Sequence, residues 1–181
     1  MNTKRETQNK SKVIIGIDPG KSGAIAVRSK GKIEIVDMPL TQDRSLNSVK
    51  IFHLLLEYRT EAEKDRSDIF CLIEKAQSMP NQGSTGVFTY GVGYGKLIAI
   101  LEILSIPFEE IRPVKWKKEF SITKKKGEGK LKSKEKKALA TKVALQLFPK
   151  CKDVFFSQRG KLFDGRVEAL LISEYGVRKN R

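Results

Sequence analysis

Residues 13–20 read VIIGIDPG, and this stretch decides the fold. The β-branched run up to Ile17 predicts a strand, and the Asp-Pro-Gly that follows predicts a turn. GAIAV at residues 23–27 and KIEIV at residues 32–36 come after short connections, which predicts an antiparallel three-stranded meander. Asp18 therefore stands at the point where the first apolar strand ends.

The rest of the chain predicts alternating helices and strands. An apolar strand at residues 69–73 ends at Glu74, and residues 78–95, rich in Gly, Ser and Asn, predict a loop. Further elements are expected as helices at about 45–59, 96–104, 132–148 and 164–177 and a strand at 108–111. This order predicts an α/β fold with a mixed sheet, three antiparallel strands and then parallel ones, and helices on both faces. Residues 1–12 are interpreted as a disordered basic arm and residues 13–178 as one domain.

The charge balance points to a polyanionic partner. Lys and Arg number 36 against 21 Asp and Glu, a net charge of +15, and residues 112–142 alone hold 13 basic and 3 acidic side chains. Nucleic acid is the first candidate, an anionic membrane surface the second, and a merely basic protein the plain alternative. No apolar run approaches the roughly 20 residues of a membrane span, so no membrane partner is expected. Two Cys and one His exclude a Cys/His zinc site and a disulfide framework.

Four acidic residues stand where acids are unexpected. Asp18 and Glu74 end apolar strands, and Asp164 and Glu168 lie four apart, on one face of the predicted last helix. Acids beside a buried apolar stripe are costly unless they are paired or bind metal. Mg²⁺ prefers such hard oxygen ligands, and phosphodiester hydrolysis gains from two ions about 3.5–4 Å apart. We therefore predict that these four residues are catalytic and hold two Mg²⁺ ions, with Mn²⁺ as a substitute.

Each acid also has a simpler interpretation. Asp18 is compatible with a turn former, Glu74 with a solvated charge at a strand end, Asp164 with a helix N-cap, and Glu168 with a partner of a neighbouring Arg. Only their combination favours a metal site. Residues 16–22 read GIDPGKS, one residue short of a nucleotide-binding P-loop, and the strand that follows argues against a nucleotide cofactor.

Three motifs resemble those of the RuvC-type Holliday junction resolvases. IGIDPG at 15–20 with SGA at 22–24 is similar to the first-strand motif of that family, IEKAQ at 73–77 to its second acidic motif, and GRVEALLI at 165–172 to its closing helix. PVKWK at 113–117 and LFP at 147–149 resemble the chloroplast branch and related bacterial and phage proteins. The resemblance spans about residues 13–177.

The resemblance implies an RNase H-like fold and a homodimer that cuts four-way DNA junctions by paired symmetric nicks, with two Mg²⁺ or Mn²⁺ ions in each active site. Asp18, Glu74 and Glu168 match family carboxylates by position. In the bacterial pattern the two helix acids are three residues apart, whereas Asp164 and Glu168 are four apart. Asp164 is therefore either a fourth metal ligand at a shifted position or a residue that supports the ligands without contacting the metal. The implied location is the cytoplasm of a bacterial or phage-infected cell, or an organelle in a eukaryote.

Aromatic and basic side chains are predicted to hold the DNA. The aromatics of the Gly-rich stretch are placed to stack on bases that open at a branch point, or alternatively to pack against the sheet. The lysines are expected to contact phosphates, and Trp116 is equally compatible with the core. The predicted DNA contacts are Phe88, Tyr90, Tyr94, Lys96, Lys115, Trp116, Lys117, Lys118, Lys124, Lys125, Lys126, Lys132, Arg159 and Lys161.

The function hypothesis is a structure-selective endonuclease that resolves four-way junctions. Its nearest rival is a metal-dependent nuclease acting on other branched DNA or on RNA–DNA hybrids. A junction-binding protein without catalysis is a second alternative, which the presence of all four acids disfavours. Actin-like ATPases and sugar kinases share a similar first-strand motif, but they are usually far longer and have two such domains.

Overall fold

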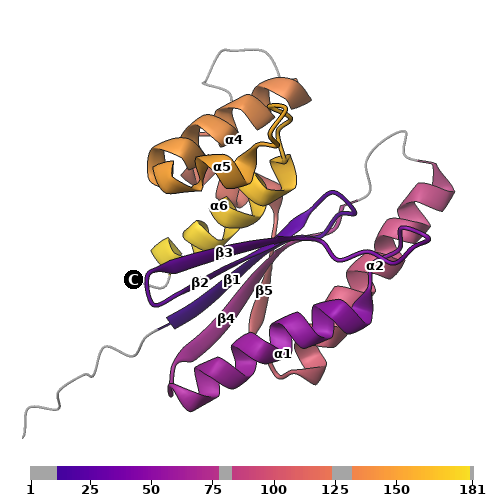
Figure 1. Cartoon of the computed structure of the whole chain (residues 1–181). Coiled ribbons are helices and arrows are strands. Elements are labelled where there is room, and N and C mark those ends of the chain that lie inside the picture. The colour runs from indigo at the N-terminus through magenta and orange to yellow at the C-terminus, as the bar shows by residue number, and fades with distance from the viewer. Residues whose placement is uncertain (1–11, 78–82, 124–131, 180–181) are drawn as a thin grey trace, which may run out of the picture.

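The computed structural model describes residues 12–77, 83–123 and 132–179. Its centre is a five-stranded mixed sheet in the order β3-β2-β1-β4-β5 (Figure 1). The strands are β1 (Lys12–Asp18), β2 (Ala24–Ser29), β3 (Lys32–Asp37), β4 (Asp68–Glu74) and β5 (Phe108–Ile111). The first three pair antiparallel, whereas β4 runs parallel to β1 and β5 parallel to β4, which confirms the predicted sheet. Lys12, predicted to belong to the arm, is the first residue of β1, and residues 1–11 lie outside the described residues.

Helices cover both faces of the sheet, as predicted. On one face lie α1 (Ser48–Lys64) and α2 (Ser84–Ile103). On the other lies α6 (Asp164–Lys179), with α3 (Pro113–Glu119), α4 (Ser133–Leu147), the 3₁₀ turn η1 (Pro149–Cys151) and α5 (Lys152–Phe155) around it (Figure 1). Strand β1 divides its side chains between the two layers: Ile15 and Ile17 pack toward α1 and α2, and Ile14 packs toward α6. This alternation is the period of two that a strand covered on both faces requires.

Helix α6 packs against β1 backbone to backbone. A Cβ atom on Gly16 would lie 2.3 Å from the carbonyl oxygen of Ala169, and one on Gly165 would lie 2.1 Å from that of Ser22. Only glycine fits at both points, because real Cβ contacts are never this short. The two glycines therefore fix the position of α6, and with it that of Glu168, over the end of β1.

The prediction of a loop at residues 78–95 is wrong from residue 84 onward. Helix α2 begins at Ser84 and runs through the Gly-rich stretch to Ile103, while residues 78–82 lie outside the described residues. Leu97 and Leu101 are fully buried in the core, and Gly93 lets the helix approach Leu46. This packing outweighs the helix propensity that each glycine loses, about 1 kcal/mol. Helix α1 also starts later than predicted, because Asn47 caps it by accepting a hydrogen bond from the Lys50 amide at 3.1 Å.

Helix α2 is also long and apolar enough to cross a membrane, by length and composition alone. This corrects the expectation that no stretch of the chain reaches that length. The same test is passed by core helices, and Leu97, Ile100 and Leu101 of α2 are packed within the protein.

A candidate carboxylate centre at the edge of the sheet

The four predicted acids come together where β1 and β4 end. Asp18 and Glu74 are the last residues of neighbouring parallel strands, whose register pairs Ile17 with Ile73. Helix α6 brings Asp164 and Glu168 to the same place. Burial raises the pKa of Asp18 to about 8, and repulsion from Glu168, Glu74 and Asp164 adds to the effect. Asp18 is thus electrostatically coupled to the three other carboxylates, a proximity that sequence order alone leaves open.

Two lysines hold the helix carboxylates. The Lys117 ammonium lies 3.2 Å from both oxygens of Glu168. Its positive charge opposes part of the burial-driven rise in the pKa values of Asp18 and Glu74. Lys137, from α4, forms an ion pair with Asp164. The interpretation of Glu168 as the partner of an arginine is thus replaced by a pair with Lys117. Lysines thus pair with two of the four carboxylates, whereas the pKa values of the other two, Asp18 and Glu74, are raised.

Glu74 is held from behind by a tryptophan. The indole Nε1 of Trp116 donates a hydrogen bond to Glu74 Oε2 at 2.7 Å, and Trp116 is fully buried. The alternative in which Trp116 is a core residue is therefore the one the structure shows, and its ring is not available for stacking on DNA. Burial raises the pKa of Glu74, and only in part do Lys117 and Trp116 oppose this.

The donor set suits divalent cations that prefer oxygen. The centre offers carboxylates without His or Cys, which favours Mg²⁺ or Mn²⁺ over zinc. Within residues 12–77, 83–123 and 132–179, no group of three or more His, Cys, Asp or Glu is arranged to hold an ion as the side chains stand. The positions next to Glu168 and Asp164 are taken by lysine ammonium groups. The raised pKa of Asp18 nevertheless fits a site that binds added cations, because a bound cation would favour the ionised carboxylate.

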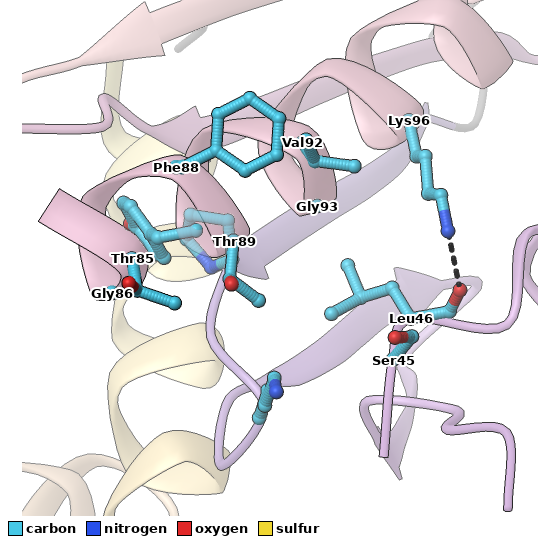
Figure 2. Close-up of a pocket in the computed structure, with 12 residues that line it drawn as sticks. Ser45, Leu46, Thr85, Gly86, Phe88, Thr89, Val92, Gly93 and Lys96 are labelled. Atoms are coloured by element: carbon cyan, nitrogen blue, oxygen red, sulfur yellow. Dashed lines mark hydrogen bonds between the residues drawn. The ribbon is translucent and has the colours of Figure 1, made fainter. Parts of the chain in front are cut away.

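A cavity of about 480 Å³ lies beside the first turns of α2 (Figure 2). It is lined by the turn after β1, by Ser45 and Leu46, and by the first turns of α2. Tyr90 connects the two places: it lines the cavity, and its pKa is raised to about 12 by burial and then by Asp18 and Glu74. Figure 2 shows Lys96 reaching the carbonyl oxygen of Leu46, at 3.3 Å. The Gly-rich segment thus lies beside the centre as expected, although as a helix.

The remaining predicted DNA contacts divide by exposure. Phe88 is 73% exposed on α2, whereas Tyr94 donates a hydrogen bond from its hydroxyl to Glu110 Oε2 at 2.6 Å. Exposed lysines and an arginine lie on α3, before α4 and in the loop before α6; they are Lys115, Lys118, Lys132, Arg159 and Lys161. Lys124, Lys125 and Lys126 lie outside the described residues.

Two roles were not foreseen from the sequence. Lys137 is one of several lysines in a row, and nothing in the sequence distinguishes it as the partner of Asp164. Lys117, a predicted DNA contact, has its ammonium against Glu168. The sequence signal for this role is the alternation of Lys, Trp and Lys on the short helix α3. One face of that helix must point inward, so a lysine next to the tryptophan can reach the protein interior.

The sheet order and the helices on both faces define an RNase H-like α/β fold. Two solved structures share it: a Thermus thermophilus RuvC in complex with a Holliday junction substrate, with a TM-score of 0.52, and a Thermus thermophilus RuvC structure, with a TM-score of 0.50. Each is 14% identical to this chain, and each alignment covers 93% of this chain and 96% of the other. No protein-family model and no curated protein match the sequence. The comparison establishes the RuvC-like fold.

We expect the metal-free protein to lose stability as the pH rises from about 4 to about 8. The pKa of folded Asp18 is about 8 against an ordinary 3.8, so in this range the folded state keeps a proton that the unfolded chain has released. Rising pH therefore favours unfolding. Thermal denaturation in EDTA across this range should show a falling Tm, with a shallower fall for Asp18→Asn. Equal slopes for the two proteins would contradict the assignment.

Proposed function

We propose that this chain is a structure-selective endonuclease that resolves four-way DNA junctions by metal-dependent phosphodiester hydrolysis. The observation that carries the proposal is the gathering of four carboxylates from β1, β4 and α6, of which Asp164 and Glu168 pair with lysines. The fold supports it, since a solved protein with the same fold is a RuvC in complex with a Holliday junction substrate.

Asp18, Glu74, Asp164 and Glu168 are the residues that would hold Mg²⁺ or Mn²⁺. When bound, two such ions activate a water molecule and stabilise the leaving oxygen of the phosphodiester. The chain itself sets the geometry: the two strand ends are fixed by the sheet, and α6 is fixed by its glycine contacts with β1 and the β1–β2 turn. Lys117 and Lys137, once released from their carboxylates, are within reach of the same site to bind phosphate oxygens.

The surroundings of the centre suit a nucleic-acid strand. The net charge of +15 supplies affinity for phosphates. The cavity beside α2 combines the cations Lys21 and Lys96 with the exposed ring of Phe88 and the hydroxyl of Thr89. Such a mixture binds backbone phosphates and unstacked bases together. Asp164 is proposed as the fourth ligand, because its carboxylate is paired with a lysine that can be displaced.

Paired nicks in opposed strands require two active sites, so we propose a homodimer as the working form. From the resemblance of residues 113–117 we also propose kinship with the chloroplast branch of these resolvases. The proposed location is the cytoplasm of a bacterial or phage-infected cell, or an organelle in a eukaryote. Sedimentation of the purified protein with and without a junction would measure the oligomeric state.

Cleavage of a synthetic mobile four-way junction tests the proposal. The protein is incubated with the junction, and in parallel with a linear duplex, a flap and an RNA–DNA hybrid, in Mg²⁺ and in EDTA. We expect paired, Mg²⁺-dependent nicks in the junction alone. Tight binding of the junction without nicks would contradict the proposed nuclease activity and would indicate a protein that only recognises junctions. Nicks confined to another substrate would retain the metal chemistry and overturn the junction specificity.

A further inference from the structure

We propose that Trp116 is a positioning residue: its indole N–H fixes the Glu74 carboxylate for metal binding, and its fluorescence reports on the occupancy of the centre. The inference rests on the carboxylate centre of the proposed function, and it adds a residue that contacts neither DNA nor metal. Its basis is the short helix α3, which packs beside α6 and presents two consecutive side chains to two different carboxylates.

The carboxylate of Glu74 is fixed in one orientation by a buried hydrogen-bond donor. Trp116 is 0% exposed, and its indole nitrogen lies 2.7 Å from Glu74 Oε2. A buried indole N–H needs an acceptor, and a charged acceptor gives a stronger bond than a neutral one. The bond engages Oε2, so metal coordination through Oε1 does not require the bond to break. Ligands whose orientation is fixed by such a bond bind metal more tightly, because less freedom is lost on binding.

Helix α3 is itself set in place by the sheet. It begins at Pro113, soon after β5 ends at Ile111, and a proline at the first helical position fits the unpaired amide there. Ile111 and Trp116 belong to the same buried cluster, which also contains Leu72 of β4. The indole is therefore anchored to the strand that carries Glu74, and not to a mobile surface.

The neighbouring residue connects the indole to the rest of the centre. The Lys117 ammonium lies 4.7 Å from the centroid of the Trp116 ring and 3.2 Å from both oxygens of Glu168. A divalent ion bound at Glu168 would compete with the Lys117 ammonium for the carboxylate, and the lysine would then leave its place beside the ring. The charge beside the indole then changes, and with it the emission of the ring. Because Trp116 is the single tryptophan of the chain, that signal has one source.

Metal binding without DNA tests the proposal. Mn²⁺ is titrated into the full-length wild type, Trp116→Phe and Phe120→Leu, and free Mn²⁺ is measured by electron paramagnetic resonance. Phe120 is the matched control, because it ends the same helix and is buried in the same cluster. We expect Trp116→Phe to bind Mn²⁺ about tenfold more weakly and Phe120→Leu to bind like the wild type. An unchanged affinity in folded Trp116→Phe would overturn the proposal, as would an equal loss in Phe120→Leu.

A second measurement needs no variant at position 116 and remains decisive if Trp116→Phe fails to fold. Mg²⁺ is titrated into the wild type and into Glu74→Gln while the tryptophan emission is recorded. We expect a saturable change in the wild type that is lost or strongly reduced in Glu74→Gln. A wild type that binds Mg²⁺ by calorimetry with no change in emission would overturn the proposal. Neither titration contains DNA, so failure of junction cleavage would refute the proposed function and leave this result standing.

Discussion

We expect Asp18→Asn to lower the rate of the proposed Mg²⁺-dependent junction cleavage by at least about a thousandfold. The carboxylate ends the central strand and is electrostatically coupled to all three other acids, so under the proposed function its loss would remove a metal ligand. Metal-ion catalysis contributes several kcal/mol, and about 4 kcal/mol corresponds to a thousandfold. Single-turnover cleavage at saturating protein measures the chemical step directly.

Two measurements distinguish this loss of cleavage rate from misfolding of the variant. Metal-free Asp18→Asn should be more stable than the wild type near pH 8, because the substitution removes a charge whose burial is unfavourable. Asp153→Asn, an exposed residue on α5, is the matched control and should cleave at the wild-type rate. An Asp18→Asn protein that retains more than about a tenth of the wild-type rate would refute a metal role for this residue.

Gly16→Ala should destabilise the protein by about 3 kcal/mol or more, a large loss for a single methyl group. The added Cβ would lie 2.3 Å from the Ala169 carbonyl oxygen and 2.4 Å from the Ser173 amide nitrogen, both backbone atoms that cannot rotate away. Relief of this contact must move α6 off β1, which also separates Glu168 from Asp18. The Tm should fall by roughly 6–12 °C, and Mn²⁺ affinity should fall with it.

Gly91→Ala is the matched control for that substitution. Gly91 lies within α2, and a Cβ there meets nothing within 4 Å. Alanine should therefore stabilise the helix by about 0.5–1 kcal/mol. If Gly16→Ala and Gly91→Ala had the same Tm, the close packing of α6 on β1 would be wrong.

The strands were predictable because their pattern is local. The β-branched run before Asp18 and the apolar run before Glu74 are buried on both faces, and such runs allow few other structures. Helix α2 was not predictable in its first half. Its glycines individually disfavour a helix, and the residues of α2 that pack in the core, Leu97 and Leu101 among them, lie in its second half.

Within the site, the sequence predicts the four acids but not the side chains that pair with them. Asp164 and Glu168 share a helix face by spacing alone, so their convergence followed from the period of 3.6 residues. The pairing of Trp116 with Glu74 joins residues 42 positions apart, and that of Lys117 with Glu168 spans 51. Such contacts depend on where α3 docks, which no local pattern contains. The same reason explains why the sequence predicts Lys117 as a DNA contact.

The most direct test of the carboxylate centre is a crystal structure of the protein soaked in Mn²⁺, with the ions located by anomalous scattering. The account predicts two Mn²⁺ peaks about 3.5–4 Å apart, bound by Asp18, Glu74 and Glu168 with Asp164 at the second ion, and Lys117 moved away from Glu168. A saturating soak that leaves Lys117 on Glu168 and Lys137 on Asp164, with no anomalous peak between the carboxylates, would contradict it.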